Sequence, residues 1–214
     1  MADPVTGMAT SRTLLVGLLA LAAVAGGCGA SAYRPLPPPV QRSTGLASPS
    51  ANAAKAGYSW LDSAPAPATW HRVRLGSGAT MVYPPGWRVL AGDRNTATAA
   101  LLDTLGHYLG YLNLTPRQGE EARASWASFR PRHNVAEGEK EVTVMDSATG
   151  LRFRSGLGSC VRDAYTTSTN SRYVEIACLV DGRRASSVIV GAALSQRWAQ
   201  ERPVIERAIA ALIT

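Results

Sequence analysis

Two cysteines placed symmetrically about a polar turn constrain the fold of this chain more than any other feature. Residues 159–167 and 172–180 are rich in strand-forming residues and flank a turn around Thr169. In a hairpin centred on that residue, Cys160 and Cys178 face each other, since each lies nine residues from the centre. Cross-strand neighbours come close enough to bridge. The sequence therefore predicts an antiparallel hairpin closed by a disulfide.

The alternative for these cysteines is a redox pair, but the chain has no C-x-x-C motif and no basic residues placed to stabilise a thiolate. The same register has one unfavourable consequence, because it sets Asp163 opposite Glu175. We expect Arg162 or Arg172 to lie between the two carboxylates.

The rest of the C-terminal two thirds reads as short strands and two helices. Strands are expected at 70–75, 79–83, 88–90, 96–102, 107–114, 141–145, 151–154 and 185–193. The segments 141–145 and 151–154 are expected to pair as a hairpin. One helix should begin near Glu120 and end before Pro131. The other should cover 198–212, with Pro203 at its first position or at a kink. This order predicts an α+β fold, an antiparallel β-sheet with helices packed on its faces.

Three tryptophans in this region are candidates for either the core or a ligand pocket. Trp87 follows a Pro-Pro-Gly corner, and Trp126 and Trp198 lie in the predicted helices. Large rings most often fill a core. A pocket for a small apolar molecule between sheet and helices is the alternative role for all three.

The N-terminus carries a charged residue, Arg12, followed by an apolar run of 15 residues, 13–27. The run has the length of a secretory signal and is shorter than the ~20 residues of a membrane-spanning helix. It ends in Ala-Gly-Gly-Cys, which resembles the lipobox of bacterial lipoproteins. The resemblance implies a signal peptide, 1–27, and a lipid on Cys28. An ordinary cleaved signal and a retained anchor helix are the alternatives, and Met8 is an alternative start to Met1.

This N-terminus predicts an extracytoplasmic protein held on the bacterial cell membrane by a lipidated cysteine. Such a compartment is oxidising, which favours the Cys160–Cys178 disulfide. Residues 28–69 are rich in Pro, Ala and Ser and predict a lipidated, flexible linker ahead of one domain, 70–214. An aromatic island at 58–61 either docks on that domain or stays loose.

No motif for catalysis, phosphate binding or metal binding is found in the sequence. There is no G-x-S-x-G, no P-loop and no G-x-G-x-x-G, and His71, His107 and His133 lie far apart. We therefore expect no enzyme activity, no cofactor and no metal. The formal net charge of +7 suits an anionic envelope polymer or simple solvation. Its scattered arginines do not indicate nucleic-acid binding.

Residues 70–214 resemble the PsbP-like domains, which include actinobacterial lipoproteins of the LpqN type. The resemblance is carried by the strand into Tyr83-Pro84-Pro85-Gly86-Trp87 and by the last helix, ending Ala208-Ile209-Ala210-Ala211-Leu212. It implies an antiparallel sheet with helices over its faces and a binding or scaffolding role without catalytic residues. We expect a non-enzymatic accessory module of the cell envelope, with an envelope protein or polymer as partner. A carrier of a small apolar ligand or lipid is the alternative.

The lipobox interpretation predicts that Cys28→Ser releases the protein from membranes, because the acyl chains would supply the anchoring energy, ~0.8 kcal/mol per buried methylene. Fractionation of cells expressing the wild type and the variant measures this. A variant that stays in the membrane fraction would show that another segment anchors the chain.

Overall fold

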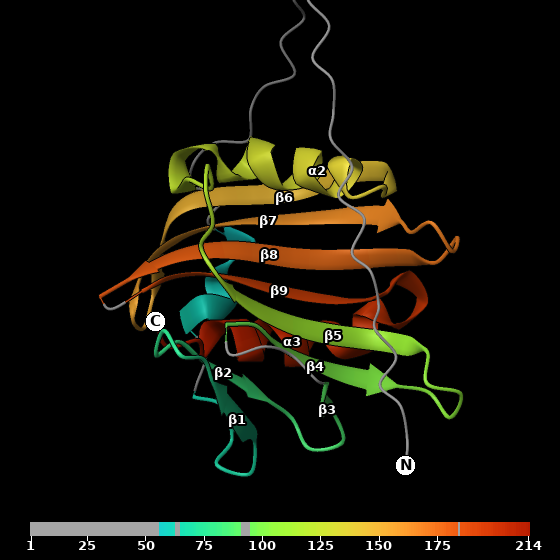
Figure 1. Cartoon of the computed structure of the whole chain (residues 1–214), viewed down its shortest axis with the longest axis horizontal. Helices are drawn as coiled ribbons and strands as arrows, with labels where there is room; N and C mark the ends of the chain where they lie inside the picture. Colours follow the sequence, from blue (N-terminus) through green and yellow to red (C-terminus); the bar gives the residue numbers. More distant parts are fainter. Residues whose placement is uncertain (1–55, 63–64, 91–94, 184) are drawn as a thin grey trace, which may run out of the picture. The chain divides into compact units, whose positions relative to one another are not determined.

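A seven-stranded antiparallel sheet with a helix on each face forms the centre of the structure (Figure 1). This computed structural model describes residues 56–62, 65–90, 95–183 and 185–214. The predicted signal peptide, Cys28 and the linker up to residue 55 lie outside the described residues. The predicted α+β class, an antiparallel sheet with helices on its faces, is confirmed.

The strand order across the sheet is β3-β4-β5-β9-β8-β7-β6. The bounds are β3 (Arg88–Leu90), β4 (Ala97–Leu102), β5 (Tyr108–Pro116), β6 (Lys140–Phe153), β7 (Gly156–Thr166), β8 (Arg172–Gly182) and β9 (Ser186–Leu194). A separate two-stranded sheet joins β1 (His71–Arg74) to β2 (Thr80–Tyr83), and Thr80 forms a bridge with Ile213 near the C-terminus.

The predicted hairpin register between β7 and β8 is confirmed. Cys160 pairs with Cys178 across the two strands, and the two residues form the predicted disulfide. Asp163 and Glu175 also face each other, as the sequence predicted. The rule of equal distance from the turn holds here because the ladder between β7 and β8 runs without a bulge.

The prediction of a hairpin within 141–154 is wrong, since these residues form the single long strand β6. The neighbouring strand β7 pairs with β6 from one end to the other, with Lys140 opposite Thr166 and Phe153 opposite Gly156. The shift of register between Ala148 and Leu151 absorbs part of the segment expected to be a turn, and two further shifts precede it. The continuous partner strand therefore overrides the local turn signal.

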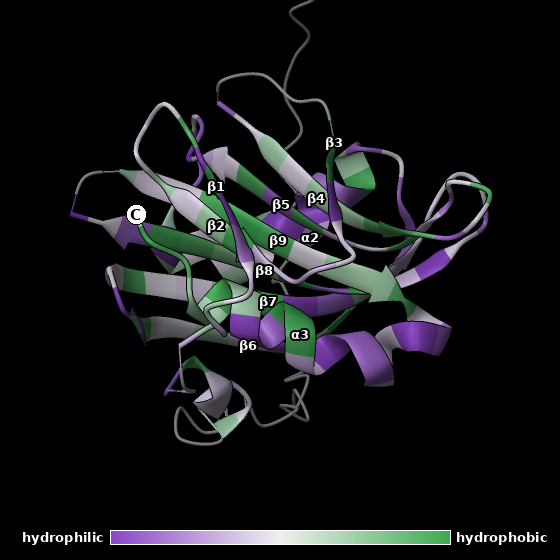
Figure 2. Cartoon of the chain, turned by 90° about the horizontal axis from the view of Figure 1, so that it is seen from below, coloured by the Kyte–Doolittle hydropathy of each residue, from purple (hydrophilic) through white to green (hydrophobic). Residues whose placement is uncertain are grey.

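The helix α3 (Trp198–Ala210) covers one face of the sheet. Its buried Ile205 and Ile209 belong to the same core cluster as Ile176, Cys178 and Ile189 of β8 and β9. Figure 2 shows β9 as a largely hydrophobic strand. The strand approaches the helix so closely that a Cβ on Gly191 would collide with the Ile205 side chain, so the contact requires glycine.

The helix α2 (Trp126–Ala136) covers part of the other face and packs on β6 and β7. The expected start near Glu120 and the expected end before Pro131 are both wrong, because α2 begins at Trp126 and continues through Pro131. The helix α3 likewise contains an internal proline, Pro203. Both begin alike: a 3₁₀ turn, η2 (Arg123–Ser125) or η3 (Ser195–Arg197), precedes the sequence W-A-x-x-R-P. Packing on the sheet offsets the lost backbone hydrogen bond.

Among the described residues, no helix combines the length and apolarity needed to cross a membrane.

The aromatic island ahead of the predicted domain docks on the core. It includes the 3₁₀ helix η1 (Ser59–Asp62), and Tyr58 and Leu61 are buried in the cluster that contains Ile205 of α3. The Tyr58 hydroxyl donates a hydrogen bond to the carbonyl oxygen of Asp146 in β6, at 3.3 Å. The packed unit thus includes residues before Trp70.

The disulfide should stabilise the folded protein by about 3 kcal/mol, because it links two residues that are 18 positions apart in the unfolded chain. Reduction should therefore lower the melting temperature by roughly 6–12 °C. Calorimetry with and without reductant measures the shift. The double variant Cys160→Ala, Cys178→Ala is the control, and its melting temperature should not respond to reductant. Free thiols at both positions in the native protein would contradict the pairing.

Candidate functional site

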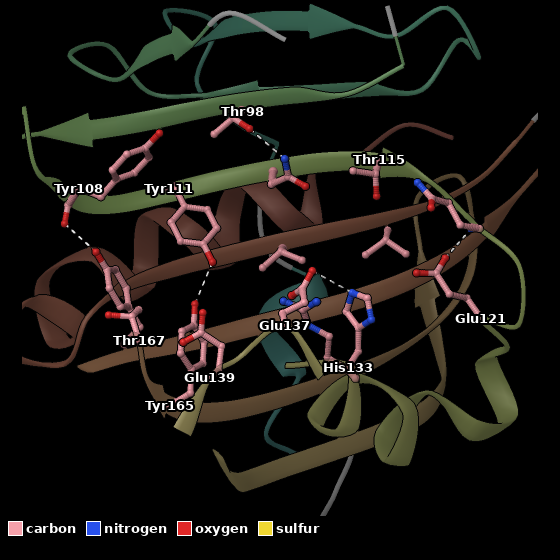
Figure 3. Close-up of a pocket in the computed structure, with 16 residues that line it drawn as sticks. Thr98, Tyr108, Tyr111, Thr115, Glu121, His133, Glu137, Glu139, Tyr165 and Thr167 are labelled. Atoms are coloured by element: carbon pink, nitrogen blue, oxygen red, sulfur yellow. Dashed lines mark hydrogen bonds and ion pairs between the residues drawn. The ribbon is translucent and has the colours of Figure 1, made fainter. Parts of the chain in front are cut away.

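A cavity of about 620 Å³ opens on the face of the sheet that α2 covers only in part (Figure 3). The helix packs on β6 and β7, and the cavity extends beside it over β9, β5 and β4. Four tyrosines and three glutamates dominate its wall, together with one arginine and one histidine. This size is typical of small-molecule sites, roughly 300–1,000 Å³.

Strand alternation places the tyrosines on this face. In β5, Leu112 and Leu114 are buried in the core toward α3, so Tyr111, between Leu112 and Gly110, points the other way. Tyr165 of β7 and Tyr173 of β8 are direct cross-strand partners on the same face as Tyr111. The strand between them, β9, presents only Ala192 opposite Tyr111. A small side chain between large ones leaves the space open.

The tyrosines are tied together by hydrogen bonds and ring contacts. The hydroxyls of Tyr111 and Tyr165 lie 2.9 Å apart, and the Tyr173 hydroxyl donates to the carbonyl oxygen of Tyr108 at 2.9 Å (Figure 3). The rings of Tyr165 and Tyr173 stack at 5.9 Å between centroids. Burial raises the pKa of Tyr111 and Tyr165 well above the usual tyrosine value, so their hydroxyls stay protonated. The wall therefore offers neutral polar groups and aromatic rings.

Next to the tyrosines, the carboxyl groups of Asp163 and Glu175 are fully buried. The expected arginines are not the ones that reach them. Arg162 pairs with Asp146 and Arg172 with Glu141, each at 3.7 Å. Arg162 cannot reach Glu175 because its neighbours Val161 and Asp163 occupy the α2 face of β7.

Arg130 of α2 supplies the compensating charge instead. Its Nε donates to Glu175 Oε1 at 2.7 Å and its Nη2 to Oε2 at 3.0 Å. One turn further on, Asn134 Nδ2 donates to Asp163 Oδ2 and to Glu175 Oε1, both at 3.3 Å. Arg130 and Asn134, one turn apart on the same face of α2, thus hold the helix on the buried carboxyl pair.

The buried pair carries one negative charge near neutral pH. Burial, together with the neighbouring Glu175 carboxylate, raises the pKa of Asp163 to about 8. Asp163 therefore keeps its proton, and Glu175 forms the ion pair with Arg130. The charge of Arg130 is balanced within this cluster, although its side chain also lines the cavity.

The end of α2 directs a further carboxylate to the cavity. Gly138 takes a φ of +98°, its N–H donates to the carbonyl oxygen of Val135, and the N–H of Glu139 donates to that of Asn134. This is a Schellman motif, which favours glycine at its left-handed position. It places Glu139 on the cavity wall, where its Oε2 is buried without a hydrogen-bond partner among the described residues. Burial and the nearby Glu137 raise the pKa of Glu139.

The other rim residues are already paired. His133 and Glu137, one turn apart on α2, lie 3.2 Å apart between Nε2 and Oε1. Glu121 Oε2 accepts a hydrogen bond from the N–H of Gln118 at 2.6 Å. In the part of the chain that the structure describes, no three His, Cys, Asp or Glu side chains are grouped so as to hold a metal ion.

The three candidate tryptophans do not line this cavity. Trp87 is buried in the core toward α3. Trp126, the first residue of α2, is 1% exposed and donates from Nε1 to the carbonyl oxygen of Ala177 at 2.9 Å. Trp198 is partly buried and packs against the core cluster beside Ile205. Each tryptophan fixes an element on the core.

Sequence reasoning did not identify the tyrosines, although one signal was available. Tyr165 and Tyr173 each lie four residues from Thr169, so the rule that paired the cysteines also pairs them. Arg130, Asn134 and Glu139 carry no comparable signal, because the register of a hairpin says nothing about the docking of a helix.

No family model matches the sequence, and no curated protein matches it. Among solved structures, the chain is similar to CyanoP, a PsbP from Synechocystis sp. PCC 6803, with 11% sequence identity and a TM-score of 0.49, over 69% of this chain and 93% of that one. It is similar to PA94 of Pseudomonas aeruginosa, a protein of unknown function, with 10% identity and a TM-score of 0.40, over 68% and 96%.

A third similar structure is LpqN of Mycobacterium tuberculosis, described as involved in cell envelope biogenesis. Its sequence identity is 12% and its TM-score 0.35, over 64% of this chain and 87% of that one. The similar structures thus include a PsbP and LpqN, the two kinds of protein named by the sequence resemblance. With all three TM-scores below 0.5, membership of the PsbP-like family stays a prediction.

The raised pKa of Asp163 predicts a pH dependence of stability. Between pH ~4, where an unfolded aspartate titrates, and pH ~8, the folded state binds one proton more than the unfolded state. The free energy of unfolding should therefore lose ~1.4 kcal/mol per pH unit through this group as pH rises. Asp163→Asn removes this titrating group. The free energy of unfolding of the variant should therefore rise relative to that of the wild type as the pH increases from 5 to 8.

Urea denaturation of both proteins at each pH measures this difference. Asp62→Asn, which removes an exposed carboxylate, controls for the change in net charge. A stability difference between wild type and Asp163→Asn that is constant with pH would show that Asp163 is ionised in the folded protein.

Proposed function

We propose that this protein is a lipid-anchored extracytoplasmic binding module that holds a small polar ligand in the cavity beside α2. The observation that carries the proposal is the cavity itself. It has the volume of a small-molecule site, and its aromatic and polar side chains converge from α2 and four strands of the sheet. In a protein selected only for stability, we would expect side chains to pack into this space.

The lining favours a polar ligand over the apolar cargo considered from the sequence. Tyrosine hydroxyls, Asn113, Thr98 and Thr115 face the space, and Val188 and Val190 are the aliphatic residues of its wall. An apolar molecule would strip water from these groups without replacing its hydrogen bonds. The tryptophans that would make an apolar pocket lie elsewhere.

The titratable groups of the cavity support binding rather than catalysis. Arg130 is held by Glu175, His133 is held by Glu137, and the hydroxyls of Tyr111 and Tyr165 bond to each other. A general acid or base needs a proton that it can exchange with the substrate. We propose that these engaged groups fix the shape of the site, and that Glu139, whose Oε2 has no hydrogen-bond partner among the described residues, serves binding rather than proton transfer.

The anchor and the envelope setting rest on the N-terminal sequence. A lipid on Cys28 would keep the domain at the membrane surface, and the linker would let it reach neighbouring envelope components. The excess positive charge of the chain suits an anionic envelope polymer. An accessory role in the cell envelope combines these features with the ligand cavity.

Native mass spectrometry of the full chain, purified from an exported and oxidised preparation, tests the binding function. We expect an added small-molecule mass on the wild type. Thr115→Trp should remove it, because the indole would fill the cavity from β5. Thr104→Trp, at the exposed turn between β4 and β5, is the control and should keep the mass.

An added mass retained by Thr115→Trp would contradict ligand binding in this cavity, and so would a wild type that carries no added mass and binds none of the small-molecule probes described below. The melting temperatures of the three proteins show whether each variant is folded.

A further inference from the structure

The charges around the cavity define the class of its ligand. The lining contains three carboxylates, Glu121, Glu137 and Glu139, and one guanidinium, Arg130. Because two of the three guanidinium nitrogens of Arg130, Nε and Nη2, donate to the buried Glu175, its charge is balanced within the wall. The cavity is therefore a negative site in a chain whose formal net charge is +7.

Glu139 is the carboxylate that lacks compensation. His133 faces Glu137, and a backbone N–H faces Glu121. Glu139 Oε2 is buried and has no hydrogen-bond partner among the described residues. The Glu139 side chain as a whole is half-buried, but its Oε2 has neither water contact nor a donor in the described part of the protein, and an external cation would supply the missing interaction.

The tyrosines complete the site for a cation. Figure 3 shows Glu139 at the end of the cavity where the hydroxyls of Tyr111 and Tyr165 meet. Aromatic faces and hydroxyl oxygens attract ammonium groups, and tyrosine clusters beside a carboxylate are a common form of cation recognition. Glu121 lies at the opposite end, so the negative charge extends along the cavity.

We infer that the cavity takes a small organic cation whose ammonium group lies against Glu139 and the tyrosines Tyr111 and Tyr165. The inference rests on the proposed function, since it names the class of the polar ligand. An anion would meet three carboxylates, and the Arg130 charge in the wall is already paired with Glu175. A neutral ligand could bond to the hydroxyls but would leave Glu139 without a counter-charge.

Isothermal titration calorimetry of the full disulfide-bonded chain tests the inference, with choline and spermidine as cationic probes, glucose as a neutral probe and inorganic phosphate as an anionic one. We expect both cations to bind and the other two probes not to bind. Glu139→Gln should weaken cation binding by roughly tenfold or more, because it removes a charged contact in a partly desolvated site. Thr115→Trp should abolish binding.

Glu120→Gln is the matched control, since it removes the same charge from an exposed residue. Glu120 precedes Glu121 in the chain but does not line the cavity. It should change cation affinity by less than about twofold, as expected of an exposed charge. Equal losses in Glu139→Gln and Glu120→Gln would show attraction to the general surface and would overturn the inference.

The two proposals fail in different ways. If neither cation binds but glucose does, or if the native protein carries a neutral or anionic mass that Thr115→Trp removes, the cavity binds a ligand and the cationic class is wrong. If no probe binds and the native protein carries no mass, both the class and the proposed binding function are wrong.

Discussion

The ion pair between Arg130 and Glu175 is the contact on which the rest of the site depends. A carboxylate in the middle of a sheet face can remain ionised only if a cation reaches it through the protein. That cation comes from α2, so the same contact satisfies the strand and fixes the helix. Asn134, one turn away, repeats the attachment with an uncharged group. The position of α2 then decides which part of the sheet stays uncovered, and the uncovered part is the cavity.

The β7–β8 hairpin carries different chemistry on its two faces. Toward α3 it presents the disulfide within an apolar core, and toward α2 it presents the carboxyl pair and the tyrosine pair. Strand alternation separates these sets although they are close in sequence. The disulfide and the wall of the cavity are thus built on the same two strands, with the covalent bond on the side away from the cavity.

The parts of the fold that sequence reasoning predicted depend on local rules. The pairing of Cys160 with Cys178 follows from symmetry about a turn, and the sheet-and-helix class follows from alternation and periodicity. The continuous β6 and the passage of α2 through Pro131 were not predicted, because distant partners outweigh the local signals of turn and proline. The cavity was not predicted because it depends on where α2 docks, and neither its tyrosines nor Glu139 belongs to a recognised motif.

The interrupted ladder of β6 has a consequence at the border of the sheet. In the strand order, β6 and the three-residue β3 are the outermost strands, so their outer backbone groups are open to pairing. The ladder of β6 shifts three times, and Glu141 takes a left-handed conformation with a φ of 52°. An incoming strand needs a regular row of N–H and C=O groups, but β3 has only three residues and β6 stays in register with its partner for at most three residues at a time. Growth of the sheet from one molecule into the next is thereby discouraged, which suits a protein that we expect to be concentrated on a membrane surface.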